Sequence, residues 1–402
     1  MKYLIVVPDG AADREIESLG GKTPLEASPM TYTNALAAEG EVGMVRTIPE
    51  GISPGSDAAN LSVMGYDPKI YLTGRSPLEA ASIGIEMSAT DVAYRANIVT
   101  LAGNGAYEDL IIKDHSSGDI STKEADELIK AINKEFENDK IKFYTGVSYR
   151  HCLIVKDGDI EYDLTPPHDV LEDIAGRHLP RGEGSDFIEQ MMRRSYEILK
   201  DHPVNLKRIE QGLNPANSLW IWGQGRKPAI PSFYEKYKIT GSTISAVDLI
   251  KGIGICAGLD SINVIGATGT LHTNYEGKAQ ATIDEFKKGK DFVYVHIEAP
   301  DECSHQGDLN GKMLSLQFVD QRVIRTVVEY LRGSGEEFKV LVLPDHRTPL
   351  VLRTHSAEPV PFVLYDSRKK ISPDTARVFT EKSGEKGKTF ESGVALASYF
   401  FE

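Results

Sequence analysis

The 402-residue chain lacks the features that mark secreted, membrane-spanning and nucleic-acid-binding proteins. Its three cysteines show neither paired nor CxxC spacing, which argues against a disulfide scaffold and for a reducing compartment. No apolar run approaches the ~20 residues of a transmembrane helix. The formal net charge of -14 opposes nonspecific binding to nucleic acid or to anionic membranes. Because the N-terminus enters YLIVVPDG without a signal-peptide pattern, we expect a cytoplasmic protein that binds neither nucleic acid nor membrane.

Glycine motifs for nucleotide binding are also missing. The stretch GGKT at 20–23 mimics the end of a P-loop, but Ile16 stands where the first glycine of that motif would be. The segment IKGIGICAGL does not fit GxGxxG and is more typical of a helix packed closely on a sheet.

Short apolar runs alternate with helical segments along both ends of the chain. The expected strands are 3–7, 42–47, 218–222, 262–265, 292–297, 339–343 and 361–364. The expected helices are 31–39, a helix beginning near Ser56, 245–257, 276–288, 311–332 and 390–400. This alternation predicts an α/β fold with a doubly wound, mostly parallel sheet that carries helices on both faces.

The middle of the chain has shorter strands and more polar turns. Strands are expected there at 95–101, 109–113, 141–145, 151–156 and 160–164, and helices at 122–136 and 185–200. We therefore predict a core domain formed by residues 1–84 and 212–402, interrupted by a smaller inserted α+β domain at 85–211.

Acidic and imidazole side chains follow three of the expected core strands. Asp9 follows the first strand, His296 ends FVYVHI with Glu298 just beyond it, and Asp345 and His346 follow the strand at 339–343. Ligand sites in open α/β sheets gather beyond the carboxyl ends of the strands. The convergence predicts a single site.

Further along, Asp301 and His305 stand at i, i+4 in HIEAPDECSHQGD. On a helical turn this spacing places both side chains on one face. A carboxylate beside an imidazole suits Mn²⁺, Zn²⁺ or Mg²⁺, and the histidine favours the first two. Taken alone, the pair is more typical of a surface turn that holds a weak ion pair; together with the other strand ends, it favours a metal site.

Ser56 lies at the apparent start of a helix in SPGSDAANL. Serine is a favoured N-cap residue, so a plain cap is one interpretation. The other is a nucleophile, because a helix N-terminus stabilises an anion and a bound metal lowers the pKa of a hydroxyl. The residues alone leave both open.

Five motifs then follow one another in a fixed order. They are PDG at 8–10, PGSDAANLSVMGYDP at 54–68, APDECSH at 299–305, PDHRTP at 344–349 and THSAEPVPF at 354–362. This set resembles the alkaline phosphatase superfamily and, more narrowly, the archaeal-type branch of the cofactor-independent (2,3-bisphosphoglycerate-independent) phosphoglycerate mutases. The resemblance extends through nearly the whole chain. It implies an alkaline-phosphatase-like, metal-binding core and an inserted substrate-binding lid.

The resemblance implies two divalent metal ions, with Mn²⁺ expected first and Zn²⁺ or Mg²⁺ as alternatives. One ligand set would be Asp9, Ser56, Asp345 and His346. The other would be Asp301, His305 and His355. His296 and Glu298 belong to neither set and are interpreted as supporting or structural residues.

It also implies interconversion of 3-phosphoglycerate and 2-phosphoglycerate, a step of glycolysis and gluconeogenesis, through a phosphoserine on Ser56. The partner would be a small phosphorylated anion; the oligomeric state stays open. Lys251 would be catalytic, and the inserted domain would keep water from the phosphoserine. The residues implied to hold the substrate are Lys251 and Arg226 in the core, and Arg150, His151, His168 and Asp169 in the insert.

Two departures from the family pattern concern the substrate. The insert is short compared with the longer mutase branch, and Leu271 and His272 stand before TNY where archaeal-type relatives often carry an acidic residue. A homoserine kinase-like phosphotransferase of threonine synthesis, or a metal-dependent phosphatase, would keep the same metals and fold with another acceptor. A non-catalytic binding protein is disfavoured by the complete ligand set.

Overall fold

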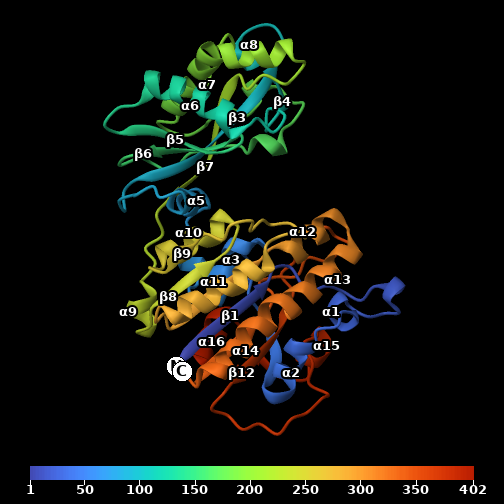
Figure 1. Ribbon diagram of the computed structural model, residues 1–402. Helices are drawn as coiled ribbons and strands as arrows, with labels where there is room; N and C mark the ends of the chain where they lie inside the picture. The colour runs from blue at the N-terminus through green and yellow to red at the C-terminus, as the bar shows by residue number, and fades with distance from the viewer. The chain divides into compact units, whose positions relative to one another are not determined.

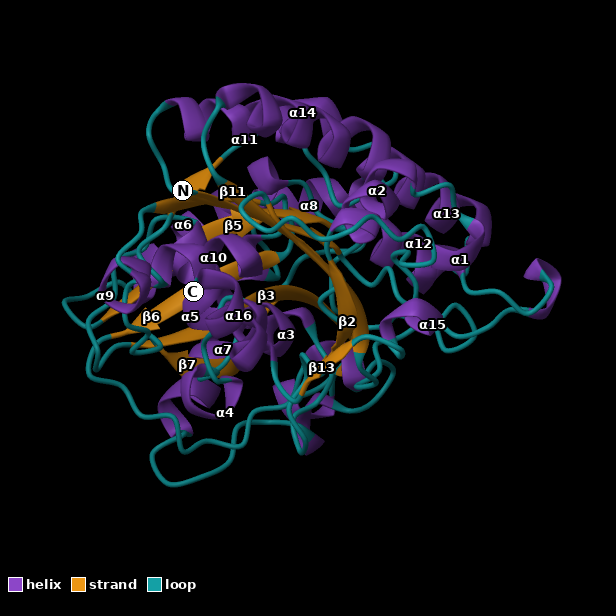
Figure 2. Ribbon diagram, turned by 90° about the horizontal axis from the view of Figure 1, so that it is seen from below, coloured by secondary structure: helices purple, strands orange, loops and turns teal.

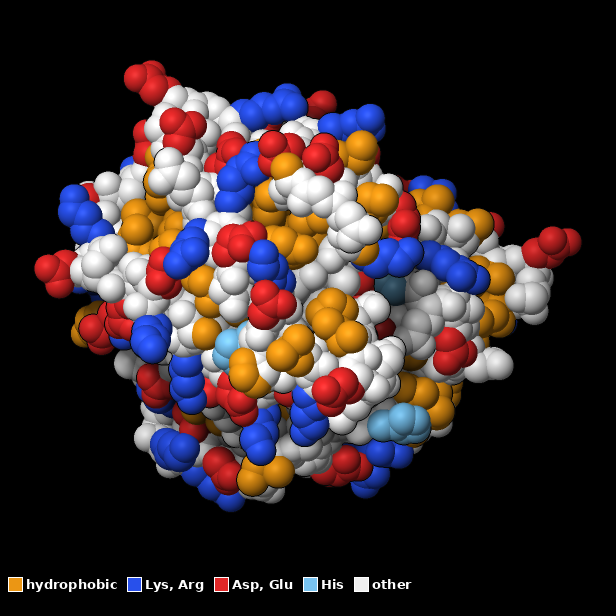
Figure 3. All heavy atoms as spheres, turned by 90° about the horizontal axis from the view of Figure 1, so that it is seen from above, with side chains coloured by type: hydrophobic (Ala, Val, Ile, Leu, Met, Phe, Trp, Pro, Cys, Tyr) orange, Lys and Arg blue, Asp and Glu red, His pale blue; other side chains and the backbone are white.

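The computed structural model describes residues 1–402 and divides into two units (Figure 1). The core unit is formed by Met1–Leu72 and Ala229–Glu402, and the inserted unit by Thr73–Pro228. None of the helices combines the length and the apolar composition needed to cross a bilayer. On the face seen in Figure 3, acidic and basic side chains are interspersed rather than gathered into one basic surface.

The core unit is built on an eight-stranded sheet. Its strands, in spatial order, are β13 (Lys388–Phe390), β2 (Glu41–Val45), β12 (Val360–Asp366), β11 (Phe338–Val342), β1 (Lys2–Pro8), β10 (Phe292–Ile297), β8 (Gly241–Ile244) and β9 (Asp260–Ile262). All pairings are parallel except the two made by β12. The predicted α/β class with a mostly parallel sheet is therefore confirmed.

Helices cover both faces of this sheet (Figure 2). One layer holds α2 (Thr31–Glu39), α11 (Tyr275–Lys287), α13 (Leu309–Phe318) and α14 (Arg325–Ser334); the other holds α3 (Ser56–Val63), α10 (Asp248–Cys256) and α16 (Gly393–Phe401). The remaining α-helices of the core unit are α1 (Pro24–Ala27), α4 (Pro68–Tyr71), α9 (Phe233–Tyr237), α12 (Ala299–Gln306) and α15 (Glu381–Gly384). Because β1 is enclosed from both sides, Leu4 to Val7 have no exposed surface. Such two-sided burial explains its uninterrupted apolar run.

The segment expected as one helix at 311–332 is divided in the structure. A π-helical turn at Val319–Ile324 separates α13 from α14. Here the buried carboxylate of Asp320 accepts hydrogen bonds from the backbone N–H groups of Tyr32 and Thr33 and from the Thr33 hydroxyl. It therefore satisfies the free donors at the start of α2, which has no side-chain cap of its own.

The inserted unit holds a five-stranded antiparallel sheet. Its strands are β3 (Val92–Ala102), β4 (Ile111–Asp114), β5 (Ile141–Val147), β6 (Arg150–Val155) and β7 (Ser218–Arg226). Its helices are α5 (Ser76–Ser82), α6 (Thr122–Phe136), α7 (Asp186–Leu199) and α8 (Pro203–Glu210). A capping box between Ser121 and Glu124 starts α6, and Ala125, Leu128 and Ile132 then form its buried face.

Three expectations differ from this arrangement. Residues 73–84 and 212–228 were expected in the core but lie in the inserted unit, where the SLWIW strand forms β7 and pairs with β3. A buried apolar run in an antiparallel sheet has the same pattern as a buried parallel strand, so periodicity could not assign it. Residues 160–164 form no strand, and the short β8 was not expected because GSTI offers little apolar signal.

Candidate metal centre

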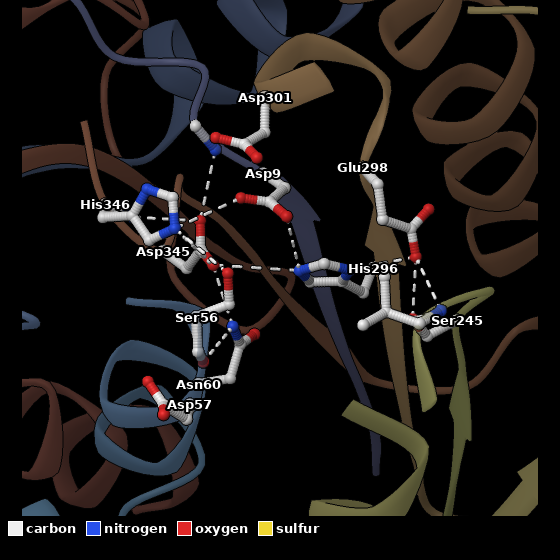
Figure 4. Close-up of polar contacts among 12 residues, drawn as sticks. Asp9, Ser56, Asp57, Asn60, Ser245, His296, Glu298, Asp301, Asp345 and His346 are labelled. Atoms are coloured by element: carbon white, nitrogen blue, oxygen red, sulfur yellow. Dashed lines mark hydrogen bonds and ion pairs between the residues drawn. The ribbon is translucent and has the colours of Figure 1, made fainter. Parts of the chain in front are cut away.

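The carboxyl ends of β1, β10 and β11 bring acidic and imidazole side chains together (Figure 4). These are adjacent strands of the core sheet: Val7 of β1 is level with His296 of β10, and Val6 with Val342 of β11. Asp9 and Asp345 therefore leave neighbouring strands in the same direction. The pairing of these neighbouring strands is enough to place the two carboxylates side by side.

The inner part of the site is fully enclosed. Asp345 and His346 have no exposed side-chain surface. The Nε2 atom of His346 lies 3.5 Å from a carboxylate oxygen of Asp9, 3.5 Å from one of Asp345 and 3.1 Å from the hydroxyl of Ser56. These four residues are the first predicted ligand set, and the structure brings them together.

The Asp345 carboxylate is held by donors on both oxygens. The backbone N–H groups of Gly10 and His346 donate to Oδ1 at 3.2 and 2.9 Å, and Asn60 Nδ2 donates to Oδ2 at 2.8 Å. Burial opposes the charge, but the imidazoles of His346 and His296 outweigh it and hold the pKa of Asp345 well below its ordinary value. Asp345 is thus a fixed anion.

Asp9 is in the opposite situation. Its Oδ1 atom is buried without a hydrogen-bond partner. Burial, followed by the charges of Asp345 and Asp301, raises the pKa of the Asp9 carboxyl well above its ordinary value. A divalent cation would relieve both the missing partner and the repulsion, so the donors present fit a metal ion.

The outer part of the site is half open to solvent. His305 Nε2 lies 3.1 Å from Asp301 Oδ2 and 3.1 Å from His355 Nε2, and His355 lies 3.5 Å from Asp301 Oδ1. The hydrogen bond to Asp301 outweighs burial and raises the pKa of His305 to about 9. His305 Nδ1 contacts the carbonyl of Arg353 at 2.9 Å, which fixes the ring.

The donor atoms form two overlapping triples. Those of Asp9, Asp345 and His346 lie within 4.8 Å of one another, and so do those of Asp301, His346 and His355. His346 thus stands between the two expected ligand sets, and His305 lies beside the second triple. This mixture of carboxylate and imidazole suits Mn²⁺ or Zn²⁺ in two neighbouring positions.

Ser56 is the first residue of α3, and Gly55 occupies the N-cap position. No side chain caps this helix, and the Ser56 hydroxyl faces His346. The carbonyl of Ser56 accepts a hydrogen bond of 2.7 Å from Asn60 Nδ2. The Ser56 side chain is therefore not a plain cap of α3.

Sequence reasoning missed two polar residues of this region. Asn60 joins Ser56 to Asp345, and its position at i+4 from the serine was an available signal. Thr348 lies between the two triples, since its hydroxyl donates to Asp301 and lies 3.2 Å from His346 Nδ1. Nothing in the local sequence marked that threonine.

Two residues predicted to bind substrate have cationic side chains in partly buried settings. Lys251 lies in α10 of the core unit, with 17% of its side chain exposed and its ammonium 3.6 Å from Asp248. Arg226 was expected in the core but ends β7 of the inserted unit. Its guanidinium donates to the carbonyls of Thr90 and Gly158 at 2.5 and 2.7 Å.

The remaining predicted substrate residues lie in the inserted unit. His151 is only 5% exposed, whereas Arg150, His168 and Asp169 are exposed. The His168 ring packs against Trp222 with centroids 5.2 Å apart. Two neighbouring side chains extend these contacts: His115 also packs against His168, and the guanidinium of Arg95 lies over Trp222.

The chain was compared with known proteins. A family model described as 2,3-bisphosphoglycerate-independent phosphoglycerate mutase matches residues 37–205. A protein of that name from Methanosarcina barkeri is 48% identical over 388 residues, which cover 96% of both chains. A probable mutase of the same kind from Geobacter sulfurreducens is 45% identical over 396 residues, 98% of both chains.

Two solved structures are similar over almost the full length. A cofactor-independent phosphoglycerate mutase from Thermoplasma acidophilum gives a TM-score of 0.68 at 27% identity and covers 99% of this chain and 98% of its own. A protein from Pyrococcus horikoshii gives 0.81 at 27% identity, covering 99% and 96%. The similarity therefore extends through both units.

Proposed function

Since the chain belongs to the 2,3-bisphosphoglycerate-independent phosphoglycerate mutase family, we propose that it interconverts 3-phosphoglycerate and 2-phosphoglycerate through a phosphoserine on Ser56. One observation carries the proposal. The Ser56 hydroxyl begins a helix and lies 3.1 Å from His346, inside a group of carboxylates and imidazoles that fits two metal ions. A helix N-terminus is a favourable place for a phosphoryl group.

In the proposed reaction, Ser56 Oγ attacks phosphorus and the bond between phosphorus and the 3-oxygen of glycerate breaks. The serine proton is lost and the 3-oxygen regains one. The 2-hydroxyl of the retained glycerate then attacks the phosphoserine, which restores the serine. Bound divalent ions would neutralise charge on the transferring group and lower the pKa of the attacking hydroxyl.

The chain's own residues position the nucleophile for this exchange. Asn60 holds the first turn of α3 through the Ser56 carbonyl and binds Asp345 with the same amide nitrogen. Its amide oxygen accepts a hydrogen bond from the buried hydroxyl of Tyr294. The serine is thereby tied to the end of β11, so its position does not depend on a mobile loop.

The substrate is an anion at both ends, and cationic side chains would hold it. We assign this role to Lys251 in α10 and to Arg150 and His168 in the inserted unit, with Asp169 orienting His168 at 3.6 Å. The guanidinium of Arg226 already donates to two backbone carbonyls, so we assign it to shaping the end of β7.

Purified protein loaded with Mn²⁺ is the reagent for testing this proposal. Given 3-phosphoglycerate, it should form 2-phosphoglycerate, detected through enolase without added 2,3-bisphosphoglycerate. Ser56→Ala should lower the rate by several orders of magnitude, because it removes the hydroxyl that carries the phosphoryl group in the proposed reaction. Ser53→Ala, in the exposed loop before α3, is the matched control and should retain the activity. Substantial activity in Ser56→Ala would rule out the phosphoserine.

The same preparation separates the alternatives. Inorganic phosphate released from 3-phosphoglycerate without 2-phosphoglycerate would assign a phosphatase. O-phosphohomoserine formed from homoserine and ATP would assign the kinase. The names of the similar proteins favour the mutase over both.

A further inference from the structure

His296 is a buried histidine that the proposed mechanism does not use. It lies near the end of β10 and has no exposed side-chain surface. Its Nδ1 atom is 3.3 Å from Glu298 Oε1. Its Nε2 atom has no hydrogen-bond partner, yet it lies 3.4 Å from Asp9 Oδ2 and 3.8 Å from Asp345 Oδ2. Figure 4 shows the ring between Glu298 and the two carboxylates.

Glu298 is firmly held on the other side of that ring. Its Oε1 atom accepts hydrogen bonds from the Ser245 hydroxyl at 2.8 Å and from the N–H groups of Ala246 and Val247 at 3.0 and 3.2 Å. Its Oε2 atom pairs with the buried ammonium of Lys278 at 2.9 Å. A buried carboxylate with this many donors is an anion in a fixed orientation.

The contacts around His296 determine which ring nitrogen is protonated and how the ring is oriented. Because Glu298 can only accept, the Nδ1 atom of His296 must carry the proton that faces it. The ring is then locked with Nε2 directed at the oxygens of Asp9 and Asp345. A leucine would fill the same space without burying a polar atom, so packing alone gives no reason for an imidazole here.

We propose that His296 is a positioning residue, which holds Asp9 and Asp345 in the orientation that binds an ion and is itself held by Glu298. This inference rests on the metal-dependent function proposed above. Hydrogen-bonded groups behind metal ligands fix ligand orientation and so contribute to ion affinity.

Glu298 also links this arrangement to the substrate side. The backbone groups that it binds, at Ala246 and Val247, come directly before α10. Lys251 lies on the first turn of that helix. One carboxylate therefore fixes both the imidazole behind the ion ligands and the start of the helix that carries the lysine.

Two amide substitutions distinguish the contact made by Nε2 of His296 from the contact made by Nδ1. Gln at position 296 places an amide nitrogen near the position of Nε2, within reach of Asp9. Asn at the same position places its amide near Nδ1, within reach of Glu298 only. The two variants have the same polarity and differ by one methylene, so a purely structural role would affect them similarly.

The measurement is binding of Mn²⁺ alone to the full-length, metal-stripped protein by isothermal titration calorimetry. His296→Asn should weaken one of the two Mn²⁺ sites about 10- to 100-fold, as expected for loss of a group behind a metal ligand. His296→Gln should keep most of the affinity. Wild-type affinity in His296→Asn, or equal losses in the two variants, would overturn the proposal.

Glu298→Gln tests whether the Glu298 carboxylate holds His296 in place. It keeps the shape of the side chain but removes the charge that holds His296, so Mn²⁺ affinity should fall and the KM for 3-phosphoglycerate should rise together. A raised KM with unchanged Mn²⁺ affinity would show that Glu298 does not act through His296. The calorimetry needs no turnover, so failure of the wild type to convert phosphoglycerate would refute the proposed function without affecting this test.

Discussion

The burial of His151 should make the inserted unit lose stability in mild acid. His151 lies on β6 and is only 5% exposed. Its Nδ1 atom accepts a hydrogen bond of 3.2 Å from the N–H of Gly146, and Nε2 has no partner. Burial outweighs the nearby charge of Asp126 and lowers the pKa of His151 to about 3. A proton added at Nδ1 would also break the bond from Gly146.

The direction in which stability changes with pH follows from the lowered pKa of His151. Below a pH of about 6.5 the unfolded chain binds a proton on this histidine that the folded chain binds only near pH 3, so stability falls as the pH falls through that interval. Above pH 6.5 the imidazole is neutral in both states and has no effect. At pH 5 the loss relative to pH 7 is about 2 kcal/mol, worked from a folded pKa of about 3.

His151→Asn removes the titrating group while its amide oxygen can still accept from Gly146. The variant should therefore lose about 2 kcal/mol less than the wild type between pH 7 and pH 5. Urea unfolding followed by tryptophan fluorescence measures this directly, because both tryptophans, Trp220 and Trp222, lie in β7 of the inserted unit.

The readout is the difference in the free energy of unfolding between pH 7 and pH 5. Any cavity left by the substitution lowers that free energy equally at both pH values and therefore cancels. His272→Asn is the matched control, because it makes the same substitution at an exposed histidine outside the inserted unit. If the free energy of unfolding fell by the same amount between pH 7 and pH 5 in His151→Asn and in the wild type, the reasoning would be refuted.

Three further outcomes are expected. Gly10→Ala should lower both the thermal stability of the protein and its affinity for Mn²⁺ in calorimetry. Gly10 has a φ of +60°, and a Cβ there would lie 2.5 Å from Thr348 Oγ1 and 2.6 Å from Asp301 Oδ1. Normal Mn²⁺ binding by this variant would contradict the prediction. Lys312→Met leaves the Asp13 carboxylate buried and unpaired and should cost about 3–5 kcal/mol in urea unfolding followed by circular dichroism; a loss below about 1 kcal/mol would contradict it, since that is the scale of an exposed pair. Chelation should abolish mutase activity and added Mn²⁺ should restore it, and full activity in protein shown to be free of metal would exclude a metal-dependent reaction.

Much of the fold could be predicted because its signals are local. The run at 292–297 coincides with β10, and the segment at 122–136 with α6, since two-sided burial and a capping box leave clear marks in sequence. Assignment of the SLWIW strand required knowledge of its partner. Its neighbour β3 lies more than a hundred residues earlier, and no local pattern encodes that pairing.

The positions of the candidate ion ligands were predictable for a similar reason. Asp9 and Asp345 follow buried strands directly, so the position of each carboxylate is set by the residues just before it. His355 is different, since it reaches His346 only because the loop between them folds back. The N–H of Ser356 donates to the carbonyl of Arg347 at 3.0 Å, which brings the two imidazole centroids to 4.0 Å. Only the family resemblance indicated that closure.

The charge balance of the core explains why the candidate ligands have no lysine or arginine partner. Two buried lysines lie in the core unit close to the site, but each is already paired: Lys278 with Glu298 and Lys312 with Asp13, at 2.9 and 2.8 Å.

None of the ion pairs of Asp9, Asp301 and Asp345 is made with lysine or arginine; all are made with histidines. An ammonium at Asp9 would satisfy its free oxygen and lower its pKa, and a metal ion would then have to displace it. By giving each lysine a carboxylate of its own, the fold leaves three acidic side chains at one place with imidazoles as their only ionic partners. An imidazole can lose its proton and bind a divalent cation itself, so the three carboxylates stay available to neutralise the charge of that cation.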